Sequence, residues 1–495
     1  MASAPPTDTR KIQAAAYVAV RWTTAASFAR TAAQLIQVAV LARLLSPADY
    51  GLMAIVTAVL SFAWLLSDLG VNTAYIQTPV ISHEQRSSLF WLHVATSFAL
   101  MLLLIFTAPL LSSLFNDERL LHLVPLTAIT LVLNALGQQV LASAEKALLF
   151  GPVVIAEILS TVIGLCAAVL AAFAGWGVYS LALSGIVTAF VSTLLAWLTI
   201  SDGWRPIWRL RAGDLKPFLG FGTSTVGSNI VNQINVTMDL FIGGRILSSA
   251  DLGLYSVPRS LCFQIQAIIN PIVTRVGFPL IAQVYSNQQR VRAVYLKTLA
   301  TTAAINAPLY VGIGVFAPEI VSLLLGHGWD RSADILRILA AWGWVRSTGS
   351  PVGSLLLGVG RPDLAFKWDA AVLLVFPPML WTGSQYGPVG LASTLLLFQI
   401  GRFVPAWYFL VRPLSQASFG EYTMSSLRPL LIASLSMIPA ALMASAFDGA
   451  ASRLLVGALV SAPAYVLLSL FGNRQWIGAI LEFLGRPSAT QRTTL

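Results

Sequence analysis

Seven ionisable side chains lie in long apolar stretches of the sequence, where a charged group is costly. They are Arg30, Glu157, Asp239, Arg259, Arg275, Arg346 and Arg402. A charge at the centre of a lipid bilayer costs roughly 2.5–3.5 kcal/mol on insertion scales, so such residues usually face a partner or a water-filled cavity. Five of the seven are arginines, whose guanidinium groups bind phosphate through paired hydrogen bonds and stay charged at any working pH. The chemistry that this set predicts is the binding of an anion.

Polar residues follow these charges at helical spacing and so share a helix face with them. The stripes are Thr23, Ser27, Arg30, Gln34 and Gln37; Ser228, Asn232, Asn235 and Asp239; Arg259, Gln266, Asn270 and Thr274; Arg346, Ser350 and Gly353; and Gln399 with Arg402. A single stripe could equally bond neighbouring helices, and an arginine near a helix end can reach the membrane surface. Several stripes together favour a cationic, water-filled cavity, which suits an anion that carries a lipid tail.

We predict that nine residues contact the substrate in this cavity: Arg30, Gln34, Gln37, Asn232, Arg259, Gln266, Asn270, Arg346 and Arg402. Two acids are candidates for ion coupling or gating. Glu157 could neutralise an arginine or carry a proton, and Asp239 could pair with an arginine or bind a coupling cation. Arg275 lies off the face of Arg259, so we expect it to have a structural role.

The amino-acid composition indicates the kind of secondary-structure element on which these residues lie. Of 495 residues, 57% are apolar and 10% are charged, against roughly 25% charged residues in soluble domains. So much apolar surface excludes soluble enzymes, nucleic-acid-binding proteins and disordered scaffolds, because a soluble core stops growing near roughly 250–300 residues. Since a transmembrane helix needs about 20 apolar residues, we predict an all-α polytopic membrane protein with about fourteen transmembrane helices. Their expected ranges are 15–44, 48–68, 87–115, 120–143, 153–174, 178–200, 218–246, 251–281, 293–325, 333–357, 364–384, 388–411, 425–447 and 451–472.

Positive charges are distributed unequally between the two sets of loops. With the N-terminus in the cytoplasm, most loop Lys and Arg residues fall on the cytoplasmic side, as the positive-inside rule requires. The asymmetry predicts a multi-pass protein with both termini in the cytoplasm. Twelve helices in place of fourteen would leave this orientation unchanged.

Residues 36–55 and 238–257 align without a gap, and both follow the pattern R-x-L-S-x-A-D-x-G-L at an expected turn between two helices. A duplicated bundle of six helices, entering the membrane twice in the same direction, explains this repeat. The expected division is an N-terminal six-helix lobe at 1–200, a cytoplasmic linker at 201–217, a C-terminal six-helix lobe at 218–411, and two extra transmembrane helices with a cytoplasmic tail at 412–495. The charged residues of the repeated turns are expected to serve the turn or a gate and not the substrate: Arg43, Asp49, Arg245 and Asp251.

Enzymatic motifs are absent from the sequence. It has no G-x-x-x-x-G-K-[ST] loop for ATP, its four histidines lack metal-ligand spacing, and no Ser/His/Asp arrangement stands out. We therefore expect no enzymatic activity, no cofactor, no metal and no nucleic-acid partner. The energy for transport would come from an H+ or Na+ gradient or from the gradient of the cargo itself.

Three stretches carry a family resemblance: ARLLSPADYGLMAI with the following SDLGVNTAYIQ, MDLFIGGRILSSADLGLYSVPR, and HGWDRSADILRILAAWG running on to LLLGVGRPDLAFKW. In them the chain resembles the Wzx-type O-antigen and exopolysaccharide flippases of the multidrug/oligosaccharidyl-lipid/polysaccharide exporter superfamily. The resemblance extends over nearly the whole chain, and the first two stretches are the most specific.

This resemblance implies a fold of two six-helix lobes with two further helices, in the bacterial inner membrane. It also implies a function, the translocation of undecaprenyl-pyrophosphate-linked oligosaccharide repeat units from the cytoplasmic to the periplasmic leaflet by alternating access. The products would be exopolysaccharide, capsule or lipopolysaccharide O-antigen. The implied partners are the lipid-linked oligosaccharide, inner-membrane lipids and a polysaccharide polymerase/co-polymerase complex. By the same resemblance, the pyrophosphate or an acidic sugar would contact Arg30, Arg259, Arg346 and Arg402, and Asp239 would couple or gate.

Two other functions fit parts of the sequence. A cation-coupled drug antiporter of the same superfamily would share the fold, but its cavity should be dominated by acids and not by arginines. A membrane enzyme or a scaffold of the synthesis complex would share the location, but the catalytic motif is missing and a scaffold would not need arginines within the membrane.

Overall fold

The computed structural model describes residues 29–68 and 70–472. Within these ranges the regular secondary structure is entirely helical and no strand occurs, as the sequence predicts. Inside the helices, side chains are not described at positions 73, 77, 217, 219–226, 228 and 271–276. Five predicted stripe or buried-charge residues lie outside the described residues or side chains: Thr23, Ser27, Ser228, Thr274 and Arg275.

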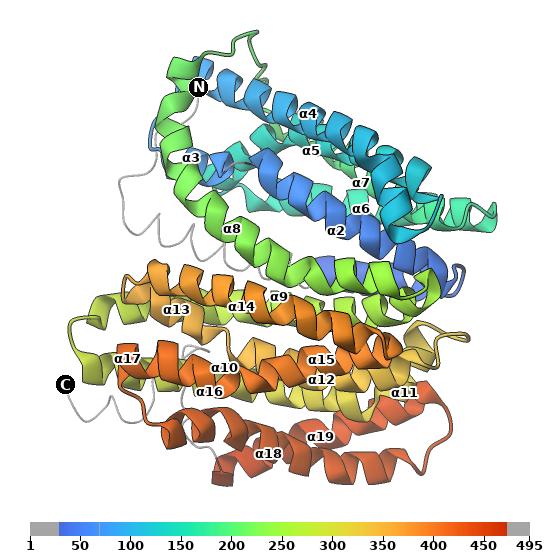
Figure 1. The fold of residues 1–495 in the computed structure, drawn as a ribbon, viewed down its shortest axis with the longest axis vertical. Coiled ribbons are helices and arrows are strands. Elements are labelled where there is room, and N and C mark those ends of the chain that lie inside the picture. The colour runs from blue at the N-terminus through green and yellow to red at the C-terminus, as the bar shows by residue number, and fades with distance from the viewer. Residues whose placement is uncertain (1–28, 69, 473–495) are drawn as a thin grey trace. The chain divides into compact units, whose positions relative to one another are not determined.

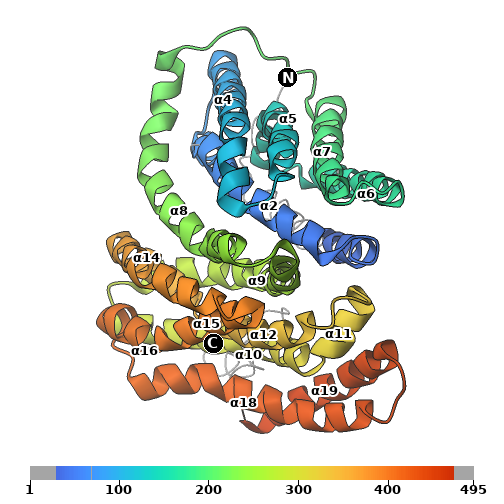
Figure 2. The same ribbon diagram turned by 45° about the vertical axis from the view of Figure 1, so that its right-hand side comes forward.

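The chain forms two compact units, and the first consists of residues 1–253. Its first helix is described over residues 29–41. The helices that follow are α2 (Pro47–Asp68), α3 (Val71–Gln77), α4 (His83–Phe115), α5 (Leu120–Lys146), α6 (Phe150–Phe173), α7 (Val178–Leu195) with a π-helix (Ala196–Ile200), and α8 (Ala212–Ile246). Helix α5 packs between α4 and α7, and α6 packs on α7 (Figure 2). The core of this unit lies between these long helices.

The second unit consists of residues 254–495. It contains most of α9 (Ser249–Val284), followed by α10 (Gln288–Val315), α11 (Ala317–Leu324), α12 (Ser332–Thr348), α13 (Pro351–Gly358), α14 (Pro362–Ser384), α15 (Gly387–Gly401), α16 (Phe403–Ala406) with a π-helix (Trp407–Val411), α17 (Arg412–Ser415), α18 (Phe419–Ala444) and α19 (Ala450–Gly472). Helix α10 packs on α12 and α18, and α12 packs on α15 (Figure 1). These contacts place α12 in the interior of the unit.

The boundary between the compact units differs from the division expected from the sequence. Helix α8 packs on α2, α3 and α4, so the boundary follows Gly253 and not the linker expected at 201–217. The last six residues of that expected linker are also helical, because α8 begins at Ala212. An acid in the first turn, Asp214, stabilises a helix that begins there.

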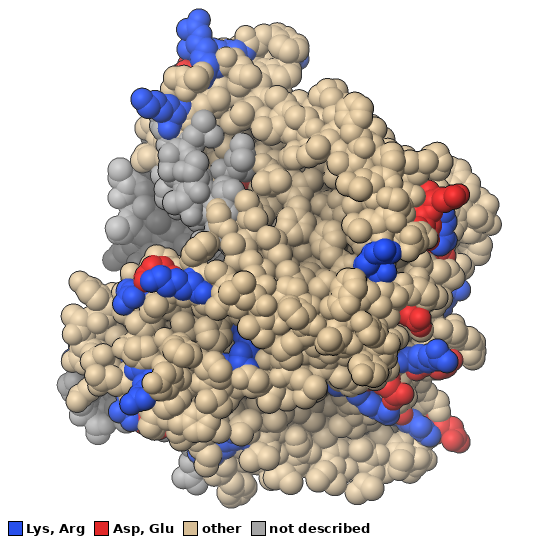
Figure 3. Space-filling model, in the orientation of Figure 1, with Lys and Arg blue, Asp and Glu red and all other residues tan. Residues whose placement is uncertain are grey.

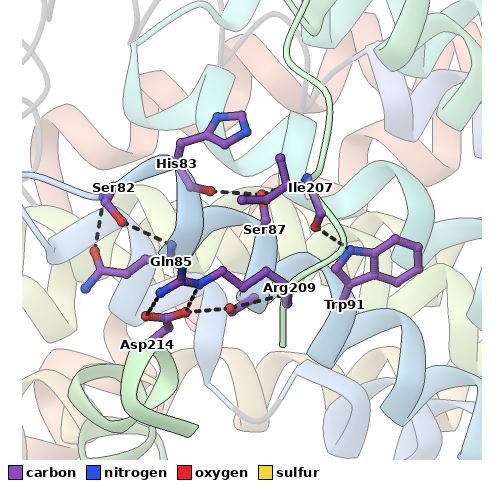
Figure 4. A network of polar contacts seen from close by, with 9 residues as sticks. Ser82, His83, Gln85, Ser87, Trp91, Ile207, Arg209 and Asp214 are labelled. Carbon is purple, nitrogen blue, oxygen red and sulfur yellow. Dashed lines mark hydrogen bonds and ion pairs between the residues drawn. The ribbon is translucent and has the colours of Figure 1, made fainter. Parts of the chain in front are cut away.

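The chain between the π-helix and α8 is fastened to the start of α4 (Figure 4). Trp91 Nε1 donates to the carbonyl of Ile207 at 2.9 Å, and the amide of Ile207 donates to Ser87 Oγ at 3.2 Å. Arg209 Nε donates to Asp214 Oδ2 at 2.9 Å. These bonds tie the first turn of α8 to α4, which explains why α8 belongs to the first unit.

Three helices that the sequence predicts as continuous are divided at a proline. The expected range 293–325 forms α10 and α11, with Pro318 in the first turn of α11. Helices α12 and α13 divide the expected range 333–357, because Pro351 has no amide hydrogen to donate to the preceding turn. In the expected range 388–411, Pro405 interrupts the hydrogen bonds in the same way between α15 and the second π-helix. The last two breaks leave Arg346 and Arg402 near the end of a helical segment.

Among residues 29–68 and 70–472, ten helices are long and apolar enough to cross a membrane. Large apolar side chains stand exposed on them, among them Phe106 at 79%, Leu374 at 80% and Phe471 at 82% exposure. Such faces are stable against lipid and not against water. On the face drawn in Figure 3, charged side chains are few and other residues form most of the surface. The chain is therefore a multi-pass membrane protein, and fourteen helices with both termini in the cytoplasm stay a prediction.

Both copies of the repeated motif form the same helix cap. At the start of α2, Ser46 Oγ donates to Asp49 Oδ2 at 2.7 Å; at the start of α9, Ser248 Oγ donates to Asp251 Oδ2 at 2.8 Å. In each copy the aspartate amide also donates to the serine hydroxyl. A serine followed three residues later by an acid is a pattern that begins helices, so these aspartates serve the turn.

The repeated motif also brings its two copies into contact. A side chain on Gly51 would overlap the carbonyl oxygen of Ser249, and a side chain on Gly253 would overlap the carbonyl oxygen of Pro47. The repeat relates Gly51 to Gly253 and Pro47 to Ser249, so the contact is symmetric. All four residues belong to the first unit. Only glycine lets the two helix starts approach so closely.

The turn between α4 and α5 holds the start of α9 as well. Asp117 Oδ2 accepts hydrogen bonds from Ser249 Oγ at 3.2 Å and from Arg119 Nη2 at 2.8 Å. Burial of Asp117 disfavours its charged form, but the hydrogen bonds from Arg119 outweigh burial and lower the pKa of Asp117. The turn therefore carries a carboxylate at neutral pH.

Candidate functional site

Arginine and aromatic side chains of α9 and α12 form a cluster in the second unit. The guanidinium carbon of Arg259 lies 4.5 Å from the centre of the Phe263 ring, and that of Arg346 lies 5.0 Å from the same ring. Arg346 is also 5.5 Å from the Trp342 ring, and the two rings are 5.3 Å apart at 66°. We call Arg259, Phe263, Trp342 and Arg346 the arginine–aromatic cluster. It joins two of the predicted substrate residues in one small volume.

The aromatic rings hold these arginines in a way that suits anion binding. A cation over a ring face gains about 0.5–2 kcal/mol, depending on how far it is desolvated. Phe263 contacts two like charges at once, so it offsets part of their mutual repulsion. A guanidinium that stacks on a ring presents its N–H donors at its edge, where a phosphate can accept two of them.

Two predicted amide side chains link α9 to α12 beside the cluster. Arg346 Nε donates to Gln266 Oε1 at 3.3 Å, and Ser347 Oγ donates to Asn270 Oδ1 at 2.8 Å. Gln266 and Asn270 follow Arg259 at helical spacing, so the polar stripe predicted for this helix faces α12. The bond to Gln266 also restricts the orientation of the Arg346 side chain.

Arg402 is linked to the cluster through an acid, Asp369, with which both Arg402 and Arg346 interact. Its guanidinium carbon is 5.7 Å from the centre of the Trp368 ring on α14. The neighbouring Asp369 interacts electrostatically with both Arg402 and Arg346. Three of the four predicted substrate arginines are thereby connected within the second unit.

Sequence reasoning missed the aromatic and acidic members of this site. Trp342 lies four residues before Arg346, and Phe263 lies four residues after Arg259. A search for rings one helical turn from each arginine in the membrane would have found both. Asp369 lies within α14 and could have been counted with the other charges in apolar stretches.

The first unit places its predicted arginine beside acids. Arg30 forms an ion pair with Glu157 of α6, and their side chains are 52% and 34% exposed. Glu145 of α5 interacts electrostatically with both groups. This arrangement is the one expected for the first of the two roles considered for Glu157, the neutralisation of an arginine. Farther along the helix, Gln37 Nε2 donates to Ser184 Oγ at 3.0 Å, whereas Gln34 is exposed.

The polar residues of α8 divide between different surroundings. Asn232 is exposed, whereas Asp239 is 2% exposed. The amide of Gln233 donates from Nε2 to Ser61 Oγ of α2 at 2.8 Å. Burial of Asp239 suits either of its predicted roles, and a cavity shared by all nine predicted substrate residues stays a prediction.

Metal chemistry finds no ligand set in the described part of the chain. Among residues 29–68 and 70–472, no group of three His, Cys, Asp or Glu side chains could hold a metal ion.

Comparisons with known proteins identify related chains and a shared fold. The lipopolysaccharide biosynthesis protein WzxC of Escherichia coli K12 is 28% identical over 408 residues, which cover 82% of each chain. The teichuronic acid biosynthesis protein TuaB of Bacillus subtilis 168 is 28% identical over 437 residues, which cover 86% of this chain and 88% of TuaB. The solved structure of the lipid II flippase MurJ in an inward closed conformation matches with a TM-score of 0.68 at 16% identity. That match covers 92% of this chain and 100% of MurJ, and it shows a shared fold.

The family described as "Polysaccharide biosynthesis protein" matches residues 40–334. This range includes both copies of the repeated motif and reaches the first turn of α12. Because it covers more than half of the sequence, the chain belongs to the polysaccharide biosynthesis protein family.

Proposed function

We propose that this protein flips undecaprenyl-pyrophosphate-linked oligosaccharide repeat units from the cytoplasmic to the periplasmic leaflet of the inner membrane. The observation that carries the proposal is the arginine–aromatic cluster, in which Arg259 and Arg346 share the Phe263 ring. Two guanidinium groups within one small volume match the two phosphates of a pyrophosphate. The exposed apolar faces of the helices keep the lipid tail of such a substrate in a hydrocarbon environment.

Family membership and the names of the relatives support the same proposal. WzxC and TuaB are named for the biosynthesis of lipopolysaccharide and teichuronic acid. We propose alternating access as the mechanism and an H+ or Na+ gradient as the energy source. The cluster disfavours drug antiport, because a cationic drug would be repelled by the paired arginines.

The test is the leaflet in which lipid-linked repeat units accumulate. In a strain that lacks this gene, undecaprenyl-linked oligosaccharide would be labelled with an impermeant probe on spheroplasts. We expect the completed units to be trapped facing the cytoplasm and to become accessible when the gene is restored. Units that already face outward in the deletion strain, with polymer still missing, would move the function downstream of flipping and overturn the proposal.

A further inference from the structure

The chain between the first π-helix and α8 is rich in cations and aromatic residues. Residues 201–216, which we call the basic segment, contain four Lys or Arg residues and two acids. The segment directly follows a stretch that is long and apolar enough to cross a membrane, Val178–Ile200. Figure 3 shows Lys and Arg side chains where the chain leads into α8 (Figure 1). The basic segment therefore lies where a transmembrane helix leaves the hydrocarbon of the bilayer.

One ring of the basic segment fastens it to the first unit. The Trp204 ring stacks on Trp197, with 5.8 Å between ring centres and 16° between planes, and the guanidinium carbon of Arg86 lies 3.9 Å from the centre of the Trp204 ring. The carbonyl of Arg209 accepts a hydrogen bond from Ser88 Oγ at 3.2 Å. With the bonds drawn in Figure 4, these contacts hold the backbone of the segment against α4. Its exposed side chains therefore form a defined surface.

That surface carries large apolar side chains. Trp208 is 88% exposed, and one face of its ring stacks on Trp91 with 4.1 Å between ring centres and 18° between planes. Leu210 is 54% exposed. Exposed indole rings are typical of the membrane–water interface, where the ring meets the acyl chains and its N–H meets the headgroups. The exposed side chains of the segment therefore fit the headgroup layer of a bilayer better than bulk water.

The cations of the same surface outnumber the acids that could neutralise them. Arg209 already occupies Asp214, because its Nε donates to Asp214 Oδ2 at 2.9 Å, and Asp202 lies at the far end of the segment. Arg205 and Lys216 are exposed, and neither forms an ion pair within residues 29–68 and 70–472. Basic residues directly beside a transmembrane helix, together with exposed aromatic side chains, are the pattern that binds anionic lipid headgroups.

We propose that the basic segment binds the headgroups of anionic phospholipids, such as phosphatidylglycerol, in the leaflet that it faces. Phosphates would accept hydrogen bonds from Arg205 and Lys216, and Trp208 would insert between the headgroups. A zwitterionic headgroup carries an ammonium group that the same cations repel, which selects the anionic class. Because the cations stand on an exposed segment, a leaflet with many headgroups can engage all of them together. This inference goes beyond the proposed function and does not depend on it.

The experiment uses Trp208 itself as the probe of lipid contact. The full-length chain would be reconstituted into nanodiscs of phosphatidylcholine that contain a rising fraction of phosphatidylglycerol brominated in its acyl chains, because bromine quenches an indole that it touches. Trp208→Phe identifies the share of the emission that belongs to this residue. We expect that share to be half-quenched at a several-fold lower fraction of brominated phosphatidylglycerol than of brominated phosphatidylcholine.

Five charge variants locate the effect. Arg205→Gln and Lys216→Gln should each raise the fraction of phosphatidylglycerol needed for half-quenching about fivefold, the change expected for one cation at an anionic surface. Arg205→Lys keeps the charge and should behave as the wild type does. Arg290→Gln and Arg331→Gln remove a charge at exposed positions outside the segment, so these matched controls should leave half-quenching unchanged.

Two further measurements separate charge from exposure of the ring. In about 1 M salt the Debye length falls to about 3 Å, so the preference of the Trp208 share for phosphatidylglycerol should disappear. Trp381 of α14 is 49% exposed and lies outside the basic segment. Its share of the emission, identified with Trp381→Phe, should be quenched alike by both brominated lipids.

Three outcomes would overturn the proposal. One is equal quenching of the Trp208 share by the two lipids, and another is an equal shift in Arg290→Gln or Arg331→Gln, which would assign the preference to the net charge of the whole protein. The third is relief of quenching by an equimolar amount of undecaprenyl phosphate, which would assign the segment to the isoprenoid carrier. Since the readout is lipid contact and not flipping, failure here leaves the proposed function standing, and failure of the leaflet assay leaves this inference standing.

Discussion

The two units hold their membrane arginines by different means. In the first unit, Arg30 pairs with Glu157 and lies within electrostatic range of Glu145. In the second unit, Arg259 and Arg346 lie against the ring of Phe263. A carboxylate opposes the charge of an arginine, whereas a ring contacts the arginine without adding a negative charge. Asp369 also interacts electrostatically with Arg346, so the second unit is distinguished by its rings and not by a lack of acids.

The contacts of the arginines indicate where an anionic substrate should bind. A phosphate near Arg30 would have to compete with Glu157, which already accepts a hydrogen bond from Arg30, and with the nearby Glu145. In the arginine–aromatic cluster, the faces of the guanidinium groups lie against aromatic rings. A phosphate there would bind N–H donors at the edges of these groups. We therefore expect phosphate to bind in the second unit, and the acidic pair of the first unit to have a structural or proton-linked role.

The largest expected effect comes from the second unit. Arg346→Ala should lower flipping about 10-fold to 150-fold, because a hydrogen bond to a charged group contributes about 1.5–3 kcal/mol. The leaflet assay in the complemented deletion strain, at matched protein levels, measures it. Arg30→Ala is the critical comparison, and an equal loss in that variant would remove the distinction between the units.

A smaller loss should follow when the ring is removed and the charges are kept. Phe263→Leu retains an apolar side chain of similar size but takes away the face that two arginines share. Flipping should fall by a few-fold to about 30-fold, since cation–π contacts contribute about 0.5–2 kcal/mol. Phe106→Leu, at an exposed position of α4, should leave flipping unchanged. If Phe263→Leu behaves like this control, the ring does not hold the arginines in place.

In the first unit, the effect of the ion pair should be modest. Arg30 and Glu157 are each about one-third exposed or more, so water screens them and their coupling should be about 1 kcal/mol or less. A double-mutant cycle with Arg30→Gln and Glu157→Gln, read by thermal unfolding of the purified protein, measures this coupling. A coupling well above that range would mean that the pair is held as tightly as a buried one.

Acid should affect the carboxylate-based contacts of the first unit before the ring-based contacts of the second, and by the smallest amount. Because folding lowers the pKa of Asp117, its stabilisation is complete above the ordinary pKa of an aspartate. It is lost as the pH falls through the lowered value of the folded state. Thermal unfolding as a function of pH should show a loss of about 1 kcal/mol or less, and Asp117→Asn should remove that dependence. The idea fails if the variant and the wild type lose stability in parallel.

Much of the fold could be predicted from the sequence because its signals are local. Apolar length marks the membrane helices, and the serine–aspartate spacing marks the starts of α2 and α9. The breaks at Pro351 and Pro405 could also have been predicted, since proline interrupts a helix in any environment. The boundary after Gly253 was not, because it depends on how α8 packs against helices distant in the sequence.

In the candidate site, too, the local features could be predicted from the sequence and the long-range contacts could not. The arginines could be predicted because a charge in an apolar stretch is conspicuous, and the stripe of α9 followed from helical phase. The pairing of Arg30 with Glu157 joins residues 127 positions apart, and no spacing in the sequence indicates it. The role of Phe263 was hidden for another reason: one more aromatic residue in an apolar segment has nothing to distinguish it.

The symmetric contact of Gly51 and Gly253 has a consequence for the evolution of the repeated motif. After a duplication, each copy is free to drift wherever the copies do not touch. The backbone of each copy occupies the space beside the other copy's glycine, so a substitution at either glycine would disturb the contact between the two copies. In a self-complementary interface of this kind, selection acts against substitutions in either copy. We expect this constraint to conserve the repeated turn in both copies.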